Sequence, residues 1–166
     1  MDSAAIVAEI PRLRRYARAL TGDAVRADDL VQDTLERALG KWSLWRPGKL
    51  GAWLFSIMHN IFVNQVRSPR PVVFPGDEAL PDLPMRATQS DALELRDLAN
   101  GLSRLPVEQR EVLLLVGLED LSYEDAAKTL GIPVGTVMSR LSRGREHLRA
   151  ILAGGEAAEN HLKIIK

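Results

Sequence analysis

A proline-rich interruption near the middle of the chain limits its fold more than any other feature of the sequence. Residues 68–90 hold five of the nine prolines of the 166-residue chain. Each proline removes a backbone donor and disfavours helix at the residue before it. We therefore expect residues 68–90 to form an extended linker that tethers two compact units, 1–67 and 91–153, at a distance, with a short tail over 154–166.

Apolar residues recur at helical spacing on both sides of this linker, and no stretch alternates with the period of a β-strand. The predicted helices cover about 4–20, 27–40, 50–67, 91–103 and 107–117, followed by a helix pair within 122–149. The expected fold is all-α. It consists of a three-helix bundle before the linker and a helix-turn-helix bundle after it.

Residues 122–149, SYEDAAKTLGIPVGTVMSRLSRGREHLR, have the pattern of a helix-turn-helix. Ser122 and Asp125 form a capping signal, and Gly131 suits the left-handed position of the turn. The second helix of such a motif enters the DNA major groove. Helical hairpins with a solvated arginine face are also common in bundles, so the motif alone leaves both interpretations open. The candidate duplex contacts are Thr136, Ser139, Arg140, Arg143 and Arg145.

All three tryptophans lie within residues 42–53, with cations beside them, and Asn60, Asn64 and Arg67 share one face of the next predicted helix. Aromatic rings stack on unpaired bases, cations follow phosphates, and asparagine can read the edge of a flipped base. Tryptophans at helix junctions are more often part of the core, and we expect this of Trp53. The candidate single-strand contacts are Trp45, Arg46, Lys49, Asn60, Asn64 and Arg67.

The charges balance at 22 basic and 22 acidic residues, so any nucleic-acid site must concentrate its positive charge locally. Arginines cluster in the last predicted helix and again at 12, 14, 15 and 18, where we expect mainly a solvated surface. The chain has no cysteine and three scattered histidines, which predicts no disulfide, metal site, cofactor or catalytic set. No apolar run is long enough for a signal peptide or a membrane span, so we expect a cytoplasmic protein without membrane insertion.

Four groups of residues, in this order and at this spacing, resemble the extracytoplasmic-function (ECF) group of bacterial RNA polymerase sigma factors. They are DLVQDT at 29–34, WLFSIMHN at 53–60, LPVEQREV at 105–112 with LSYEDAA at 121–127, and GTVMSRLSRGR at 135–145. Proteins of this group contain little more than sigma regions two and four. The resemblance covers about residues 5–67 and 91–152.

The resemblance implies a transcription initiation factor, not an enzyme, that binds core RNA polymerase at its β′ clamp helices and β flap and directs it to promoter DNA. It assigns the −35 element to the second helix of the helix-turn-helix. Asn60 would capture a flipped −10 base beside the loop Trp45–Lys49, and an anti-sigma factor would regulate the chain. The implied polymerase contacts are Asp29, Gln32, Asp33 and Glu36. Two alternatives stay open: a sigma mimic that sequesters an anti-sigma factor, and a stand-alone helix-turn-helix regulator.

Overall fold

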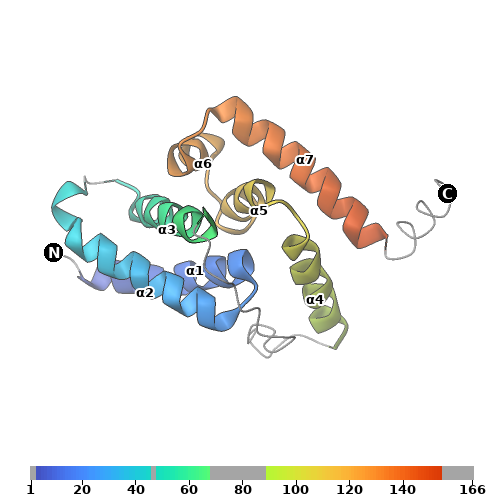
Figure 1. The fold of residues 1–166 in the computed structure, drawn as a ribbon, viewed down its shortest axis with the longest axis horizontal. Coiled ribbons are helices and arrows are strands. Elements are labelled where there is room, and N and C mark those ends of the chain that lie inside the picture. The colour runs from blue at the N-terminus through green and yellow to red at the C-terminus, as the bar shows by residue number, and fades with distance from the viewer. Residues whose placement is uncertain (1–2, 46–47, 68–88, 155–166) are drawn as a thin grey trace.

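The computed structural model describes residues 3–45, 48–67 and 89–154, and every element within these ranges is helical (Figure 1). The predicted all-α class is therefore confirmed. The expected linker lies outside the described residues except for its last two, and so does the expected tail after Gly154. No helix in the described ranges combines the length and apolar character that a membrane span requires.

The first module contains the three helices that the sequence predicts. They are α1 (Ser3–Thr21), α2 (Ala24–Gly40) and α3 (Leu50–Arg67), with a short 3-10 turn, η1 (Trp42–Leu44), before α3. Helix α1 ends where Gly22 adopts a positive φ of 71°. Asp23 then caps α2 by accepting a hydrogen bond from the backbone N–H of Val25. Leu13, Leu30 and Leu54 each bring a fully buried side chain from one of the three helices. This shared core holds the bundle together.

The second module contains α4 (Gln89–Ser103), α5 (Val107–Leu113), α6 (Tyr123–Leu130) and α7 (Val134–Ala153). The predicted caps are confirmed. Ser122 accepts a hydrogen bond from the N–H of Asp125 at 3.1 Å, and Gly131 has a φ of 67° at the turn between α6 and α7. Val137 and Leu141 are buried, which fixes the side of α7 that faces α5 and α6.

The predicted helix over residues 107–117 changes character before it ends. Its last turn is a π-helix, η2 (Leu114–Leu118), and the N–H of Glu119 donates to the carbonyl of Leu114 at 3.0 Å. Asp120 then takes a left-handed φ of 57°, which aspartate tolerates better than most residues. This wider turn sets the direction in which Glu119 leaves the helix.

The two modules pack against each other, contrary to the expectation that the linker holds them at a distance. Helix α3 lies against α6, α1 contacts α4, α5 and η2, and α5 occupies the centre of the molecule (Figure 1). The buried apolar side chains of both modules form one continuous cluster. Long-range apolar and ionic contacts bring the modules together, and a linker composition does not reveal such contacts.

Candidate nucleic-acid and polymerase interfaces

Helix α7 presents four of its five predicted duplex contacts on a single face. At about 100° per residue, Thr136, Ser139, Arg140 and Arg143 fall within about 100° of the helix circumference. Ser139 and Arg143 are exposed, and the other two are partly exposed. The hydroxyl of Ser139 donates to the carbonyl of Gly135 at 2.9 Å, so its oxygen remains available as an acceptor. This face is polar, cationic and at least partly exposed.

Arg145 does not join this face, because it lies about 180° around the helix from Thr136. It lines an open groove of about 410 Å³ between α6 and α7, together with Tyr123 and Met138, which are both exposed. The sequence places Arg145 close to Arg143 along the chain, and the helix separates them in space. The structure therefore divides the predicted set into a face and a separate groove.

The three tryptophans, two before α3 and one in its first turn, have rings that form a cluster. The ring centroids of Trp42 and Trp45 lie 5.0 Å apart, and those of Trp45 and Trp53 lie 6.5 Å apart. Trp53 is partly buried and packs against the core, which is close to the expectation for it. Trp45 is half-buried, so one part of its ring still faces solvent. Arg46, predicted beside it, lies outside the described residues.

Asn60 and Asn64 are exposed on the same face of α3, as predicted. The backbone of Arg67 closes the helix, and its side chain lies outside what the structure describes. Lys49 forms an ion pair with Asp125 of α6 instead of standing free. This hydrogen bond is the main cause that lowers the pKa of Asp125 below its ordinary value. Of the predicted single-strand contacts, Asn60 and Asn64 are exposed, Trp45 is partly buried, and Lys49 is engaged in an ion pair.

The acidic face of α2 matches the prediction in position. Asp29, Gln32, Asp33 and Glu36 are all exposed, and their spacing of three and four residues aligns them along one side of the helix. Asp33 and Glu36 also line a shallow groove of about 440 Å³. A ridge of exposed acids of this kind suits a basic partner surface.

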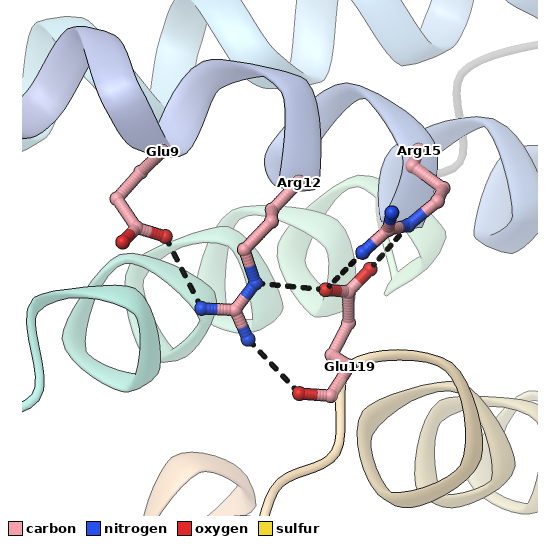
Figure 2. Close-up of polar contacts among 4 residues, drawn as sticks. All are labelled: Glu9, Arg12, Arg15 and Glu119. Atoms are coloured by element: carbon pink, nitrogen blue, oxygen red, sulfur yellow. Dashed lines mark hydrogen bonds and ion pairs between the residues drawn. The ribbon is translucent and has the colours of Figure 1, made fainter.

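The sequence analysis missed a polar contact between the modules, which Figure 2 shows. The side chain of Glu119 is fully buried, and its carboxylate accepts hydrogen bonds from Arg12 Nε at 3.0 Å, Arg15 Nε at 3.1 Å and Arg15 Nη2 at 3.0 Å. Arg12 Nη2 also donates to the Glu119 carbonyl at 2.9 Å. We name Arg12, Arg15 and Glu119 the Glu119 latch.

Several forces hold the arginines of the latch in place. The hydrogen bond to Glu119 is the main cause that raises the pKa of Arg15. Arg12 also pairs with Glu9 at 3.3 Å, and its guanidinium lies 5.4 Å from the centroid of the Phe55 ring. Arg12 and Arg15 belong to the arginine group for which the sequence predicted mainly a solvated surface. An acid directly after the apolar run 112–118 was the one available signal that Glu119 is buried.

Two neighbouring residues of α5 make further contacts across the modules. Glu111, which is buried, contacts Nδ1 of His59 on α3. Arg110 donates to the carbonyl of Leu20 in α1 at 2.7 Å and to that of Leu102 in α4 at 2.8 Å. Burial lowers the pKa of Arg110, and the guanidinium nevertheless stays charged at neutral pH.

Comparison with known proteins divides the chain at the same place as the two modules. Residues 6–59 match the family described as "Sigma2 domain of PhyR", and residues 95–148 match "Sigma-70, region 4". The chain is 44% identical over 149 residues to the "ECF RNA polymerase sigma factor EcfG" of Rhodopseudomonas palustris (strain TIE-1). This alignment covers 89% of the chain and 82% of that protein.

Two solved structures share the fold. The sigma factor RpoE in complex with the anti-sigma factor NepR from Bartonella quintana has a TM-score of 0.76 and 35% identity, covering 92% of this chain and 96% of that one. The anti-anti-sigma factor PhyR, also complexed with NepR from Bartonella quintana, has a TM-score of 0.61 and 17% identity, covering 89% of this chain and 49% of that one. The second likeness is one of fold alone.

Proposed function

The chain belongs to the ECF RNA polymerase sigma factors, and we propose that it reads the two elements of its promoters with α7 and α3 while α2 contacts core polymerase. As a sigma factor it directs RNA polymerase to promoters and is not expected to catalyse a reaction itself. The observation that carries the proposal is the exposed polar face of α7, which lies within the residues that match sigma-70 region 4.

We propose that α7 enters the major groove of the −35 element with Thr136, Ser139, Arg140 and Arg143 toward the DNA. A serine hydroxyl can contact several bases, and arginine pairs bidentately with guanine or binds phosphate. The buried side of α7 supports this orientation, because Val137 and Leu141 hold a different face against the module core. Arg145 would contact phosphate at most, since it points away from this face.

For the −10 element, the proposed reader is the exposed face of α3 that bears Asn60 and Asn64, with Trp45, Arg46, Lys49 and Arg67 beside it. Unstacking a base costs a few kcal/mol, and stacking returns about 1–3 kcal/mol per base. Binding of one base in a pocket therefore offsets the free-energy cost of opening about one base-pair step. Contacts with polymerase must supply the free energy for opening the other steps. The isolated chain should accordingly bind promoters weakly.

The acidic face of α2, formed by Asp29, Gln32, Asp33 and Glu36, is the proposed contact for the β′ clamp helices. A second contact, between the helix-turn-helix module and the β flap, would hold α7 over the −35 element. The exposure of these four α2 side chains supports the first of these contacts. These partners act in the cytoplasm, which is therefore the proposed location of the chain.

We also propose that an anti-sigma factor regulates the chain. The support is the similarity of this fold, over 92% of the chain, to RpoE in its complex with the anti-sigma factor NepR. A rival function is that of a sigma mimic, which would bind an anti-sigma factor without binding DNA. The match to the sigma2 domain of PhyR favours the rival, whereas the 44% identity to EcfG and the exposed Arg143 and Asn60 favour a DNA-binding sigma factor.

The direct test adds the full chain to sigma-free core polymerase on a library of promoter fragments. We expect open complexes on a subset of the fragments that share two spaced elements. A stand-alone regulator or a mimic would bind no core polymerase and open none of the templates, and that outcome would refute the proposal.

Two substitutions separate the proposed roles of α3 and α7. Asn60→Ala should impair strand opening more than closed-complex formation, with exposed Asn100→Ala on α4 as its control. Arg143→Ala should weaken the closed complex by about 1–3 kcal/mol, with exposed Arg104→Ala as its control. Permanganate footprinting measures opening, and a salt-dependent gel shift measures the closed complex. Identical defects in both variants would contradict the division of roles.

A further inference from the structure

The contacts between the modules use part of the surface that is proposed to bind the −10 element. Lys49, beside the tryptophan cluster, pairs with Asp125 of α6. On α3 itself, His59 contacts the buried Glu111. These contacts engage the middle of α3 and a cation that would otherwise be available to phosphate, whereas Ser139 and Arg143 of α7 stay exposed.

The closed arrangement is also too short to reach both promoter elements. Elements centred near −10 and −35 are separated by about 25 base pairs, which is about 85 Å of B-form duplex at 3.4 Å per step. A compact chain of this length has a radius of gyration of about 15 Å and is therefore about 40 Å across. The peptide steps between Arg67 and Gln89 span at most about 75 Å when fully extended. Engagement of both elements thus requires the modules to separate, and the covalent connection is long enough for this.

The Glu119 latch is a buried polar contact that must break when the modules separate. Glu119 is fully buried and accepts three hydrogen bonds from two arginines of the other module. The arginines are only partly covered, with 35% of the Arg12 side chain and 53% of the Arg15 side chain exposed. Water and anions can therefore reach both guanidiniums, which makes the contact reversible and sensitive to salt.

We propose that the Glu119 latch is an autoinhibitory contact: it holds the free chain in a closed state that cannot engage both promoter elements, and binding to polymerase and DNA opens it. The consequence for the promoter rests on the proposed function, whereas the latch itself is a property of the free chain. A buried carboxylate between two arginines suits this purpose, because removal of either partner leaves the other charge without its compensation. A single substitution in the latch can therefore change the free-energy difference between the closed and open states.

The test measures the distance between the modules in the full chain. The chain has no native cysteine, so Val25→Cys on α2 and Leu152→Cys on α7, both at exposed positions, can carry a pair of spin labels. Pulsed electron resonance should give one narrow, short distance distribution for the parent chain. Glu119→Gln should add a longer, broad component and raise the open-to-closed ratio at least tenfold, which is about 1.4 kcal/mol.

Two further variants keep the test decisive. Arg15→Gln attacks the same contact from the exposed side of α1, so it carries the test if Glu119→Gln loses helical content. Glu94→Gln on α4 makes the same charge change at an exposed position and should leave the distances unchanged. The double variant Arg15→Gln/Glu119→Gln should raise the open-to-closed ratio by less than the product of the two single-variant increases. Both substitutions remove the same contact, so their effects are not independent.

Three outcomes would overturn the inference. The parent chain could already give a broad and long distribution, both latch variants could leave the short distribution unchanged, or the short distance could persist in an active initiation complex. The last result would reject the autoinhibition while the chain still initiates transcription. Failure of the proposed function would instead appear as a chain that closes and opens as expected but never forms an open complex with core polymerase.

Discussion

Arg110 offers a sharp test of how one side chain stabilises the fold, because it joins the end of α4 in its own module to the end of α1 in the other. Besides Leu20 and Leu102, its guanidinium donates to the carbonyl oxygens of Ser103 at 3.1 Å and Leu105 at 3.0 Å. These carbonyls lie at or just beyond the C-terminal ends of α1 and α4, where the helix dipole favours a cation and backbone acceptors lack helical partners. We consider Arg110→Met, which keeps most of the aliphatic volume and removes every donor.

The expected loss follows from the burial of the four acceptors. A hydrogen bond from a charged donor contributes about 1.5–3 kcal/mol. Ser103 is exposed, so water replaces the donor there, whereas Leu20, Leu102 and Leu105 are buried. Simple addition over three buried acceptors would overshoot, because such contacts are not additive and water enters partly. A buried acceptor left unsatisfied costs about 1–3 kcal/mol, so we expect Arg110→Met, at this partly buried position, to lower the free energy of unfolding by about 3 kcal/mol.

Urea titration followed by two probes measures the loss. Far-UV circular dichroism reports on the helices of both modules, and tryptophan fluorescence reports on the first module, because all three tryptophans lie within residues 42–53. Both midpoints should fall together for Arg110→Met. Arg110→Lys should retain part of the stability, since an ammonium lacks the planar fork. Exposed Arg104→Met is the control. A change within about 0.5 kcal/mol of the parent chain for Arg110→Met would refute the reasoning.

Three other predictions concern buried and paired side chains. The hydroxyl of Tyr16 is buried without a hydrogen-bond partner among the described residues, and burial raises its pKa well above the ordinary value. Tyr16→Phe should therefore raise the free energy of unfolding by about 1 kcal/mol in a urea melt, and an equal fall would show a paired hydroxyl. Because the pKa of Asp125 is lowered in the folded chain, its contribution is complete above the ordinary carboxyl pKa of about 3.9 and is lost as the pH falls through the lowered value. Lys49→Met should accordingly reduce the loss of stability between about pH 5 and pH 3, and an unchanged profile would show that the pair contributes nothing. Leu115→Ala, at a fully buried position, should cost about 2–5 kcal/mol in the same melts, and a loss below about 1 kcal/mol would indicate a loosely packed core.

The elements were predictable because their signals are local. Ser122 and Gly131 act through neighbours within a few residues, so the cap and the turn of the helix-turn-helix follow from the sequence. The face of α7 follows from its period as well, and the same period places Arg145 on another side of the helix, where its role in −35 binding stays a prediction. The helix rotates by about 100° per residue, which sends Arg143 and Arg145 to different surfaces.

The packing of the modules was not predictable, because it leaves no regular spacing of residues in the sequence. Arg12 and Glu119 are 107 residues apart in the chain, and each has an ordinary local explanation. An arginine on a helix usually faces solvent, and an acid after an apolar run usually ends a helix. Only the three-dimensional arrangement shows that the two side chains satisfy each other.

The position of Glu119 depends on the number of residues in the π-helical turn at residues 114–118. A π turn holds one residue more than an α turn, and that extra residue displaces everything after it. Deletion of one residue there would restore α geometry and rotate Glu119 by about 100°, away from α1. Homologues could therefore acquire or lose this closure through a single codon insertion or deletion, with both arginines left in place.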